Sequence, residues 1–383
     1  MSVTSAQGFG AAGVAAGLKA SGDPDVALVV NYGPLDAAAG VFTSNRVKAA
    51  PVLWSEQVLK AGRLTAVVLN SGGANACTGP GGFQDTHATA ERVAERLGCG
   101  AADVAVCSTG VIGERLDMNA LLPGIDAAAG AANKDGGQTA ATAILTTDTH
   151  PKTVTIENNG WVVGGMVKGA GMLAPALATM LCVLTTDAVA DADALATALR
   201  AATKKTFDRI DSDGCMSTND TVLLLASGAS KTSPTQEELN QAVTAACEDL
   251  ARQLIGDAEG ASKEIAIRIT GAASEEEAVT VARSISRNNL LMCALFGNDP
   301  YWGRVLAAIG TTDATFDPDR IDVSFNGVKT CVNGTKNPEA ETADITPRHL
   351  DLEVDLHAGT STATVHTNDL TLAYVHENSA YTS

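Results

Sequence analysis

The stretch KGAGMLAPALATMLCVLTTDA, residues 168–188, contains the longest nearly unbroken apolar run in the chain. Glycines and a proline precede the run, and its apolar residues predict a buried strand. A single hydroxyl, that of Thr179, lies in the middle between Ala178 and Met180. The residue has two interpretations. Either Thr179 hydrogen-bonds a backbone carbonyl inside the core, or the surrounding chain presents this hydroxyl for a reaction.

The reaction in the second interpretation is self-cleavage. A threonine hydroxyl can attack the carbonyl carbon of the preceding residue, here Ala178, so that the acyl group moves from nitrogen to oxygen and water then cleaves the ester. Thr179 becomes a new N-terminus, and its α-amino group, with a typical pKa near ~7.7–8, can act as the base for its own hydroxyl. No histidine is required, and the small Ala178 leaves the attacked carbonyl accessible.

Composition limits the classes of protein to consider. The 383 residues suggest two or three domains, and 45% apolar but only 4% aromatic residues predict a large core of Ala, Val, Leu and Ile. A net charge of −18 disfavours nucleic acids and anionic membranes as partners, because both require a basic surface. The N-terminus does not resemble a secretory signal, and no apolar run reaches the roughly 18 residues of a membrane span. We therefore expect a soluble, cytoplasmic protein.

The eight cysteines are scattered, and none forms a CxxC pair. Most lie in apolar segments, which predicts buried, reduced thiols. Because no group of cysteines and histidines has the spacing of a zinc site, we expect no metal.

Short β-branched runs between turn residues predict buried strands, and amphipathic segments between them predict helices. The strands are predicted at residues 26–30, 65–70, 104–107, 153–156, 161–167, 221–227 and 264–271. The fold class is therefore mixed α/β. From about residue 285 the pattern changes to alternating strands, which predicts a smaller C-terminal domain.

Capping residues predict where three of the helices begin or end. One helix is predicted over residues 86–98, with Thr86 as its N-cap and Gly98 at its end. A second begins after Ser233, and a third begins after Ser274, which has Glu277 three residues later.

The segment CSTGVIG, residues 107–113, is a second candidate for chemistry. It directly follows a predicted strand, and its Thr109–Gly110 pair can direct a hydroxyl and a backbone N–H at one point, as in an oxyanion hole. The alternative is an ordinary turn. The glycine-rich segments at 70–77 and 79–82 match neither a Walker nor a dinucleotide-binding loop, and no GxSxG elbow occurs.

Motifs along the whole chain resemble the ornithine acetyltransferase family, the glutamate N-acetyltransferases of arginine biosynthesis. They include MVKGAGMLAPALATMLCVLTTDA, CSTGVIGERL, STNDTVLLLASG, DAEGASKEIAIRITG, LFGNDPYWGRVLAAIG and the C-terminal ENSAYTS. Two positions depart from the family pattern: Gly73 replaces the first Asn of an Asn-Ala-Asn loop, and Tyr301 replaces the Asn of Pro-Asn-Trp-Gly-Arg. We assign no role to either residue.

The resemblance implies a self-cleaving acyltransferase with an N-terminal threonine nucleophile and the layered α/β sandwich of some aminopeptidases. It assigns the nucleophile to Thr179, freed by cleavage after Ala178, and the oxyanion hole to Thr109 and Gly110. The substrate-contacting positions that it implies are Thr146, Lys168, Thr179, Glu259, Asn378 and Ser383. Thr147 is nearly as good a match as Thr146, because the length of this segment varies.

The resemblance also implies a division of the chain. Residues 1–178 form a first fragment within the catalytic sandwich, residues 179–284 complete that core, and residues 285–383 form a strand-rich domain whose tail lines the site. The two fragments remain together and are expected to pair into a heterotetramer with two copies of each.

The implied reaction moves an acetyl group from N-acetylornithine to glutamate through an acetyl-threonine intermediate, without a bound cofactor. Whether acetyl-CoA also serves as a donor is left open by the sequence. The first alternative is an aminopeptidase or amidase of the same fold that transfers the acyl group to water. The second is an uncleaved homologue that only binds amino acids, and the competent residues at every assigned position argue against it.

Overall fold

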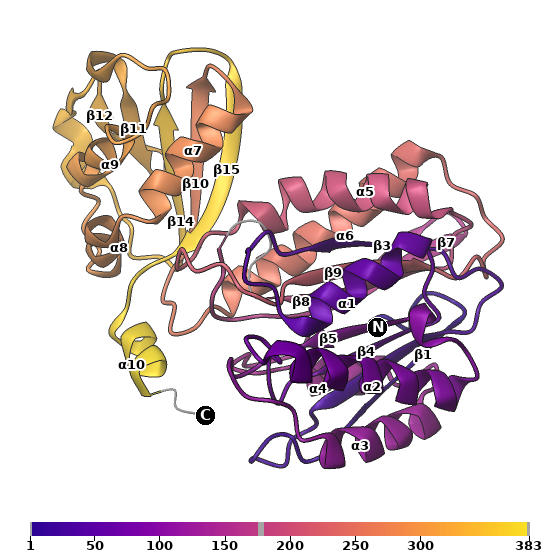
Figure 1. Cartoon of the computed structure of the whole chain (residues 1–383). Coiled ribbons are helices and arrows are strands. Elements are labelled where there is room, and N and C mark those ends of the chain that lie inside the picture. Colours follow the sequence, from indigo (N-terminus) through magenta and orange to yellow (C-terminus); the bar gives the residue numbers. More distant parts are fainter. Residues whose placement is uncertain (1, 175–179, 381–383) are drawn as a thin grey trace. The chain divides into compact units, whose positions relative to one another are not determined.

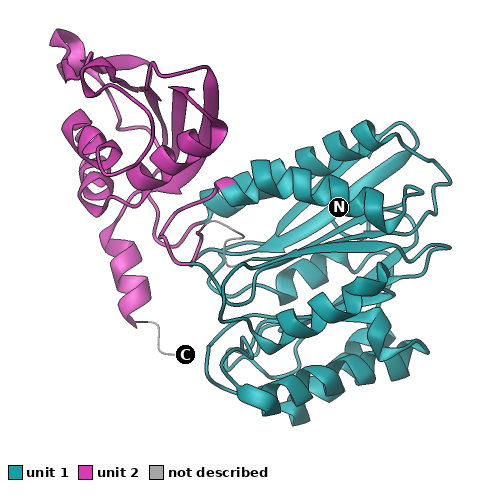
Figure 2. Cartoon of the chain, turned by 45° about the horizontal axis from the view of Figure 1, so that its top comes forward, with its two compact units in different colours: residues 1–170, 176–208, 216–257 teal, residues 171–175, 209–215, 258–383 magenta. Residues whose placement is uncertain are grey.

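The computed structural model describes residues 2–174 and 180–380 (Figure 1). The predicted cleavage residues Ala178 and Thr179 and the predicted contact Ser383 therefore lie outside the described residues. The chain forms two compact units (Figure 2). Unit 1 consists of residues 1–170, 176–208 and 216–257, and unit 2 of residues 171–175, 209–215 and 258–383.

Unit 1 contains two sheets. The four-stranded sheet has the order β1 (Phe9–Val14), β2 (Val26–Asn31), β4 (Ala66–Asn70) and β5 (Val104–Ser108). The first two pairings are antiparallel, and β4 runs parallel to β5. Every residue of β2, β4 and β5 is buried, as expected for Val- and Ala-rich strands that are covered on both faces.

The five-stranded sheet interleaves strands from both sides of the predicted cleavage position. Its order is β3 (Ala38–Phe42), β9 (Thr221–Ala226), β8 (Leu181–Thr186), β7 (Trp161–Lys168) and β6 (Lys152–Asn158). The β8–β9 pairing is parallel, and the other pairings are antiparallel. The apolar stretch after Thr179 thus forms β8, the central strand.

The two sheets pack face to face. A core that includes Val29, Leu69, Met166, Val183 and Leu223 lies between them. Helices α2 (Gly79–Leu97) and α3 (Met118–Ala131) pack on the outer face of the four-stranded sheet, and α5 (Ala192–Lys205) and α6 (Gln236–Gly256) cover the other sheet (Figure 1). Unit 1 is therefore a four-layered α/β sandwich, which confirms the predicted fold class.

The remaining helices of unit 1 are short. Helix α1 (Ala50–Val58) packs against β5 and α2, and α4 (Gly137–Ala143) contributes Ala140, Ala141 and Ala143 to the core between the sheets. The 3-10 turns of the chain are Leu59–Ala61, Ala101–Asp103, Phe207–Arg209, Pro318–Arg320 and Pro338–Thr342.

Unit 2 contains one six-stranded sheet. Its order is β13 (Thr335–Lys336), β12 (Val328–Val332), β11 (Asp322–Phe325), β14 (His349–Asp355), β10 (Glu264–Ala272) and β15 (Ser361–Asn368). Helices α7 (Glu275–Ser286), α8 (Asn289–Phe296) and α9 (Trp302–Ile309) share a separate apolar core with this sheet. The last helix, α10 (Leu372–Ala380), has no buried residue.

Unit 2 begins earlier than the expected position near residue 285. Strand β10 pairs in parallel with β14 and antiparallel with β15, so it lies inside the sheet of unit 2. Helix α7 then packs on β10 and β15. Long-range pairing therefore places residues 258–284 in the second unit.

The caps of two helices differ from the prediction. Helix α2 begins at Gly79, and the Thr86 hydroxyl inside it donates to the Gly82 carbonyl. Helix α6 begins at Gln236 with Thr235 as the N-cap, because Thr235 and Glu238 form a capping box. The predictions for Thr86 and Ser233 were therefore wrong. The Ser274 cap of α7 and the end of α2 at Gly98 are confirmed.

All eight cysteines are free. The prediction of burial holds for only half of them, because Cys77, Cys215 and Cys293 are exposed and Cys99 is intermediate. Among the helices that the structure describes, none combines the length and apolarity required to cross a membrane.

Candidate functional site

Thr109 lies directly after β5 in a turn tied to the loop that follows β4. The Thr109 N–H donates to the Asn70 carbonyl at 2.9 Å, and the Thr109 carbonyl accepts from the Gly73 N–H at 3.0 Å. The Asn70 side chain adds a bond to the Gly73 carbonyl and accepts from the Ser108 hydroxyl. The backbone of Thr109 is thus fully paired, and its hydroxyl is the group that remains for chemistry.

Gly110 is the next residue, and its conformation requires glycine. Its φ is +128°, and a Cβ at this position would lie 2.7 Å from the Gly73 nitrogen. Within the described ranges the Gly110 N–H makes no hydrogen bond, so it is suited to receive an oxyanion. The backbone of Gly73 packs directly against Gly110.

Lys168 is the last residue of β7 and pairs with Leu181 at the start of β8. Its side chain is buried, and its Nζ donates to the Thr109 hydroxyl oxygen at 3.4 Å. A hydroxyl that accepts from an ammonium keeps its own O–H to donate. Lys168 and Thr109 therefore form a cationic donor pair next to the Gly110 N–H.

Asp148 links the predicted contact Thr146 to the end of β7. One oxygen, Oδ2, accepts from the Thr146 N–H at 3.1 Å, and the other, Oδ1, accepts from the Gly169 N–H at 2.6 Å and from Lys152 Nζ at 2.7 Å. The Thr146 hydroxyl lies 3.5 Å from Oδ2. A single buried carboxylate thus fixes the chain beside both Thr146 and Lys168.

Two lysines determine the charge state of Asp148. Burial alone would raise its pKa, but the positive charges of Lys168 and Lys152, with hydrogen bonds from Lys152 and Gly169, outweigh burial and hold the pKa at about 2. Lys152 Nζ is also bonded to Asp257, and neither lysine side chain has appreciable exposure. The Asp148 carboxylate is therefore ionised at neutral pH, close to two buried lysines of unit 1.

The segment before β9 connects the Thr109 turn to the residue after the predicted nucleophile. The Asn219 side-chain amide donates to the Ser108 carbonyl at 2.8 Å and to the Ala74 carbonyl at 2.6 Å. The neighbouring Asp220 accepts at Oδ1 from the Met180 N–H at 3.1 Å. Thr179 lies outside the described residues, but Met180, to which it is covalently joined, is held next to the segment that supports Thr109.

Unit 2 contains the other two predicted contacts that the structure describes. The Asn378 side-chain amide, on α10, donates to Glu259 Oε2 at 3.0 Å, and the Glu259 carboxylate packs against Gly171. Glu259 also lines a cavity of about 370 Å³ with Asp213 and Tyr374. Burial, together with the charges of Asp213 and Glu259, raises the pKa of Tyr374 to about 12. Three carboxylates and the guanidinium of Arg287 line this cavity, and the carboxylates suit an ammonium group.

The structure thus groups most of the predicted residues into two sets, one in each unit. Thr109, Gly110, Lys168 and Thr146 are joined in unit 1 through direct bonds or through Asp148, and Glu259 and Asn378 are in contact in unit 2. Thr147, the alternative to Thr146, is exposed. Three residues of this group were not predicted from the sequence: Asp148 in TTDTH, and Asn219 and Asp220 in STND. No neighbouring motif distinguishes them from turn residues.

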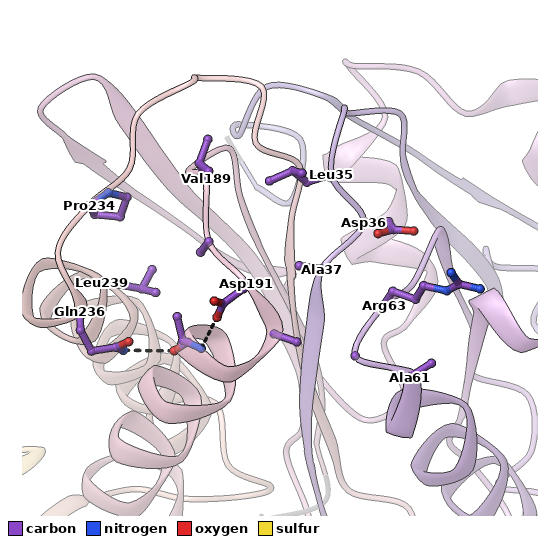
Figure 3. A pocket seen from close by; sticks show the side chains of 14 residues that line it. Leu35, Asp36, Ala37, Ala61, Arg63, Val189, Asp191, Pro234, Gln236 and Leu239 are labelled. Atoms are coloured by element: carbon purple, nitrogen blue, oxygen red, sulfur yellow. Dashed lines mark hydrogen bonds between the residues drawn. The ribbon is translucent and has the colours of Figure 1, made fainter.

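A cavity of about 600 Å³ elsewhere in unit 1 contains none of the predicted site residues. Figure 3 shows Gln236 and Leu239 on one side of it and Arg63 and Ala61 on the other. Asp191, which also lines it, is engaged as the N-cap of α5. The larger of the two cavities therefore lies away from the predicted site residues.

Similarity to known proteins extends over nearly the whole chain. The family model described as the ArgJ family matches residues 10–383. The chain belongs to the ArgJ family. A curated relative from Streptomyces coelicolor, named an arginine biosynthesis bifunctional protein, is 64% identical over 383 residues and covers 100% of both chains. A relative of the same name from Mycobacterium tuberculosis is 58% identical over 100% of this chain and 96% of its own.

Two solved structures are also similar. A crystal structure of ornithine acetyltransferase complexed with ornithine, from Mycobacterium tuberculosis, is 60% identical, with a TM-score of 0.45, and the match covers 47% of this chain and 96% of that one. An arginine biosynthesis bifunctional protein from Bacillus halodurans is 36% identical, with a TM-score of 0.49 and coverage of 51% and 97%. The family model and the curated relatives, which match along nearly the whole chain, favour the acetyltransferase interpretation over the aminopeptidase alternative.

Proposed function

We propose that this protein is a glutamate N-acetyltransferase that moves the acetyl group of N-acetylornithine to glutamate. One observation carries the proposal: the chain is 64% identical, from end to end, to a bifunctional protein of arginine biosynthesis. The geometry in unit 1 supports it, because Thr109, Gly110 and Lys168 provide hydrogen-bond donors, and the neighbouring residues Asn219 and Asp220 hold the Thr109 turn and the Met180 N–H.

In the proposed mechanism the Thr179 hydroxyl attacks the acetyl carbonyl of N-acetylornithine, and the Thr179 α-amino group takes the hydroxyl proton. The oxyanion of the tetrahedral intermediate accepts from the Thr109 hydroxyl and the Gly110 N–H. The C–N bond then breaks, the proton passes to the leaving amine, and ornithine departs. The amino group of glutamate attacks the acetyl-threonine ester in the same way, which forms N-acetylglutamate and restores the Thr179 hydroxyl.

The charged residues suggest how the substrates are recognised. The Lys168 ammonium suits a substrate carboxylate, and the Glu259 carboxylate, oriented by Asn378, suits the ornithine side-chain ammonium. Thr146 and the C-terminal Ser383 complete the proposed contacts. None of these steps requires a bound cofactor or a metal ion.

Three further features belong to the same proposal. Acetyl-CoA serves as a second donor, in keeping with the word bifunctional in the names of the relatives. The chain is cleaved after Ala178, and its two fragments assemble as a heterotetramer. The enzyme works in the cytoplasm.

Intact-mass measurement of the wild type and of T179A tests the nucleophile. We expect two fragments that meet at Ala178 and Thr179 in the wild type, only the full-length chain in T179A, and partial cleavage in T179S, which keeps a hydroxyl. A full-length wild type, or a cleaved T179A, would refute the assignment.

The acceptor distinguishes the transferase from the hydrolase. We expect consumption of N-acetylornithine to depend on glutamate and to yield N-acetylglutamate. Acetate release at the same rate without glutamate would establish an amidase instead. Formation of N-acetylglutamate from acetyl-CoA and glutamate would establish the second activity.

A further inference from the structure

Both backbone polar groups of Met180 are held in place. Its N–H donates to Asp220 Oδ1 at 3.1 Å, and its carbonyl accepts from the Thr221 N–H at 3.1 Å. Met180 is also buried. Met180, the second residue after the predicted cleavage bond, is thus fixed before β8 begins, and the side chain of Asp220 supplies one of the two restraints.

Asp220 is an unusual residue for this place. Its side chain is fully buried, and Oδ2 has no hydrogen-bond partner among the residues that the structure describes. Burial raises the pKa of the Asp220 carboxyl well above its ordinary value, against the opposing effects of hydrogen bonds from Met180, Ser217 and Thr43 and of the charge of Lys168. Buried polar atoms without partners are rare in folded proteins, and each requires an explanation.

Asp187, at the other end of β8, provides a comparison within the same sheet. It is also fully buried. Its Oδ1 accepts from the Val162 N–H at 2.8 Å and its Oδ2 from the Gln7 N–H at 3.1 Å, so both oxygens have backbone partners. Asp187 therefore has a structural role at two backbone N–H groups, whereas Asp220, within the part of the chain that the structure describes, holds the N–H of Met180 with one oxygen and makes no hydrogen bond with the other.

We propose that Asp220 is a positioning residue for self-cleavage: its Oδ1 holds the Met180 N–H while the Thr179 hydroxyl attacks the Ala178 carbonyl carbon. The inference rests on the proposed function, because it assumes cleavage at that bond. The peptide unit that joins Thr179 to Met180 is planar, so holding its N–H orients the whole unit. Asn219, the preceding residue, holds the Ser108 carbonyl, so a single short segment supports both the Met180 backbone and the Thr109 turn.

The bond changes belong to Thr179 and Ala178, and Asp220 is unchanged at the end. The Thr179 Oγ–C bond forms as the C–N bond of the Ala178–Thr179 peptide breaks, and the hydroxyl proton ends on the Thr179 nitrogen. Water then hydrolyses the ester, which leaves a carboxylate on Ala178 and restores the hydroxyl of Thr179. The loss of Asp220 would therefore slow this reaction without changing its products.

The test follows cleavage of full-length chains made by cell-free translation, with the fraction cleaved measured over time by intact mass. D220A and D220L both remove the acceptor, and D220L preserves the branched shape. D220N keeps an oxygen acceptor and resembles the neutral acid. D187A is the matched control, because it also removes a fully buried carboxylate that accepts a backbone N–H beside β8. Circular dichroism and thermal unfolding report whether each variant folds.

We expect D220A and D220L to cleave at least tenfold more slowly than the wild type, and D220N and D187A to remain within about threefold of it. A slow D220N that is folded would overturn the inference, since it keeps the acceptor. Equal slowing in D187A, or wild-type rates in D220A, would also overturn it and would leave the proposed function intact. A wild type that never cleaves would instead refute the proposed cleavage and this inference with it.

Discussion

At the residue scale, we propose that the hydroxyl of Thr109 is an oxyanion donor. Its backbone groups are paired, and Lys168 donates to its oxygen, so its O–H remains to stabilise developing negative charge. We expect T109A to lower kcat by about a hundredfold or more, which corresponds to roughly 3 kcal/mol of barrier, with a smaller change in KM. Steady-state kinetics with N-acetylornithine and glutamate measure the effect.

The conservative variant T109S is the control, because it restores a hydroxyl. If T109S retained no more activity than T109A, the hydroxyl would not be the important group. A T109A enzyme that differed from the wild type only in KM would assign Thr109 to substrate binding instead.

Gly110 provides a second prediction at this scale. Alanine there would have to adopt a φ of +128°, with its Cβ 2.7 Å from the Gly73 nitrogen. We expect G110A to distort the Thr109 turn, to lower the free energy of unfolding by about 1–3 kcal/mol and to reduce activity. Chemical denaturation and transfer assays measure the two effects.

Gly130 is the matched control. It lies on α3, and no atom would meet a Cβ within 4 Å. Because alanine is the better helix former, G130A should raise stability by about 0.5–1 kcal/mol and leave activity unchanged. If G110A were as stable and active as G130A, the close packing against Gly73 would have no functional consequence.

At the element scale, the segment that joins α4 to β6 and the end of β7 are held together by Asp148. Its pKa of about 2 lies below the ordinary value of 3.8, and a difference of this size corresponds to roughly 2–3 kcal/mol. Because the pKa is depressed in the folded state, the contribution is fully present above about pH 4 and is lost as the pH falls through about 2.

We therefore expect D148N to lower the free energy of unfolding by about 2–4 kcal/mol near neutral pH, since it also removes a partner from the buried Lys152. The difference from the wild type should shrink as the pH is lowered from about 4 towards 2. Urea denaturation at a series of pH values measures this. A difference that did not change with pH would show that the charge of Asp148 contributes nothing.

The elements also show what the sequence could predict. The strands at β2, β4, β5, β7 and β9 were found because apolar, β-branched runs between turn residues identify buried strands locally. The starts of α2 and α6 were misplaced because several capping residues occur close together, and only the backbone geometry selects Thr235 over Ser233. Where several capping residues lie close together, the sequence alone therefore does not show which of them is the N-cap.

The candidate site was predictable only in part. Thr109 and Gly110 form a recognisable pair directly after a strand, so a local motif could reveal them. Asp148 and Asp220 act through partners far along the chain, such as Gly169 and Met180, and an isolated aspartate beside threonine or asparagine resembles an ordinary turn residue. Long-range pairing likewise places β10 in unit 2, which no local pattern could indicate.

At the scale of the whole molecule, each unit has an apolar core of its own. Phe325, on β11, is fully buried in unit 2, and Phe207 is fully buried in unit 1. We expect F325A to lower the stability of unit 2 by about 3–5 kcal/mol, and F207A to do the same for unit 1. Hydrogen exchange followed by mass spectrometry should show lost protection in β10 and β14 for F325A, and in β8 and β9 for F207A.

The two variants serve as controls for each other. Equal loss of protection in both units from either substitution would mean that the chain unfolds as one cooperative body, in spite of its two cores.

The interleaved order of the five-stranded sheet has a consequence for a chain cut after Ala178. Strands β3, β7 and β6 would then belong to one polypeptide and β8 and β9 to another, with β9 pairing to β3 and β8 to β7. One folded sheet would thus become a binding interface, and refolding would become a second-order reaction. By mass action, dilution should lower the melting temperature of the cut protein and leave that of an uncut T179A chain unaffected. The stability of the cleaved enzyme would therefore depend on the dissociation constant of its two fragments, whereas that of the uncut chain depends only on its folding equilibrium.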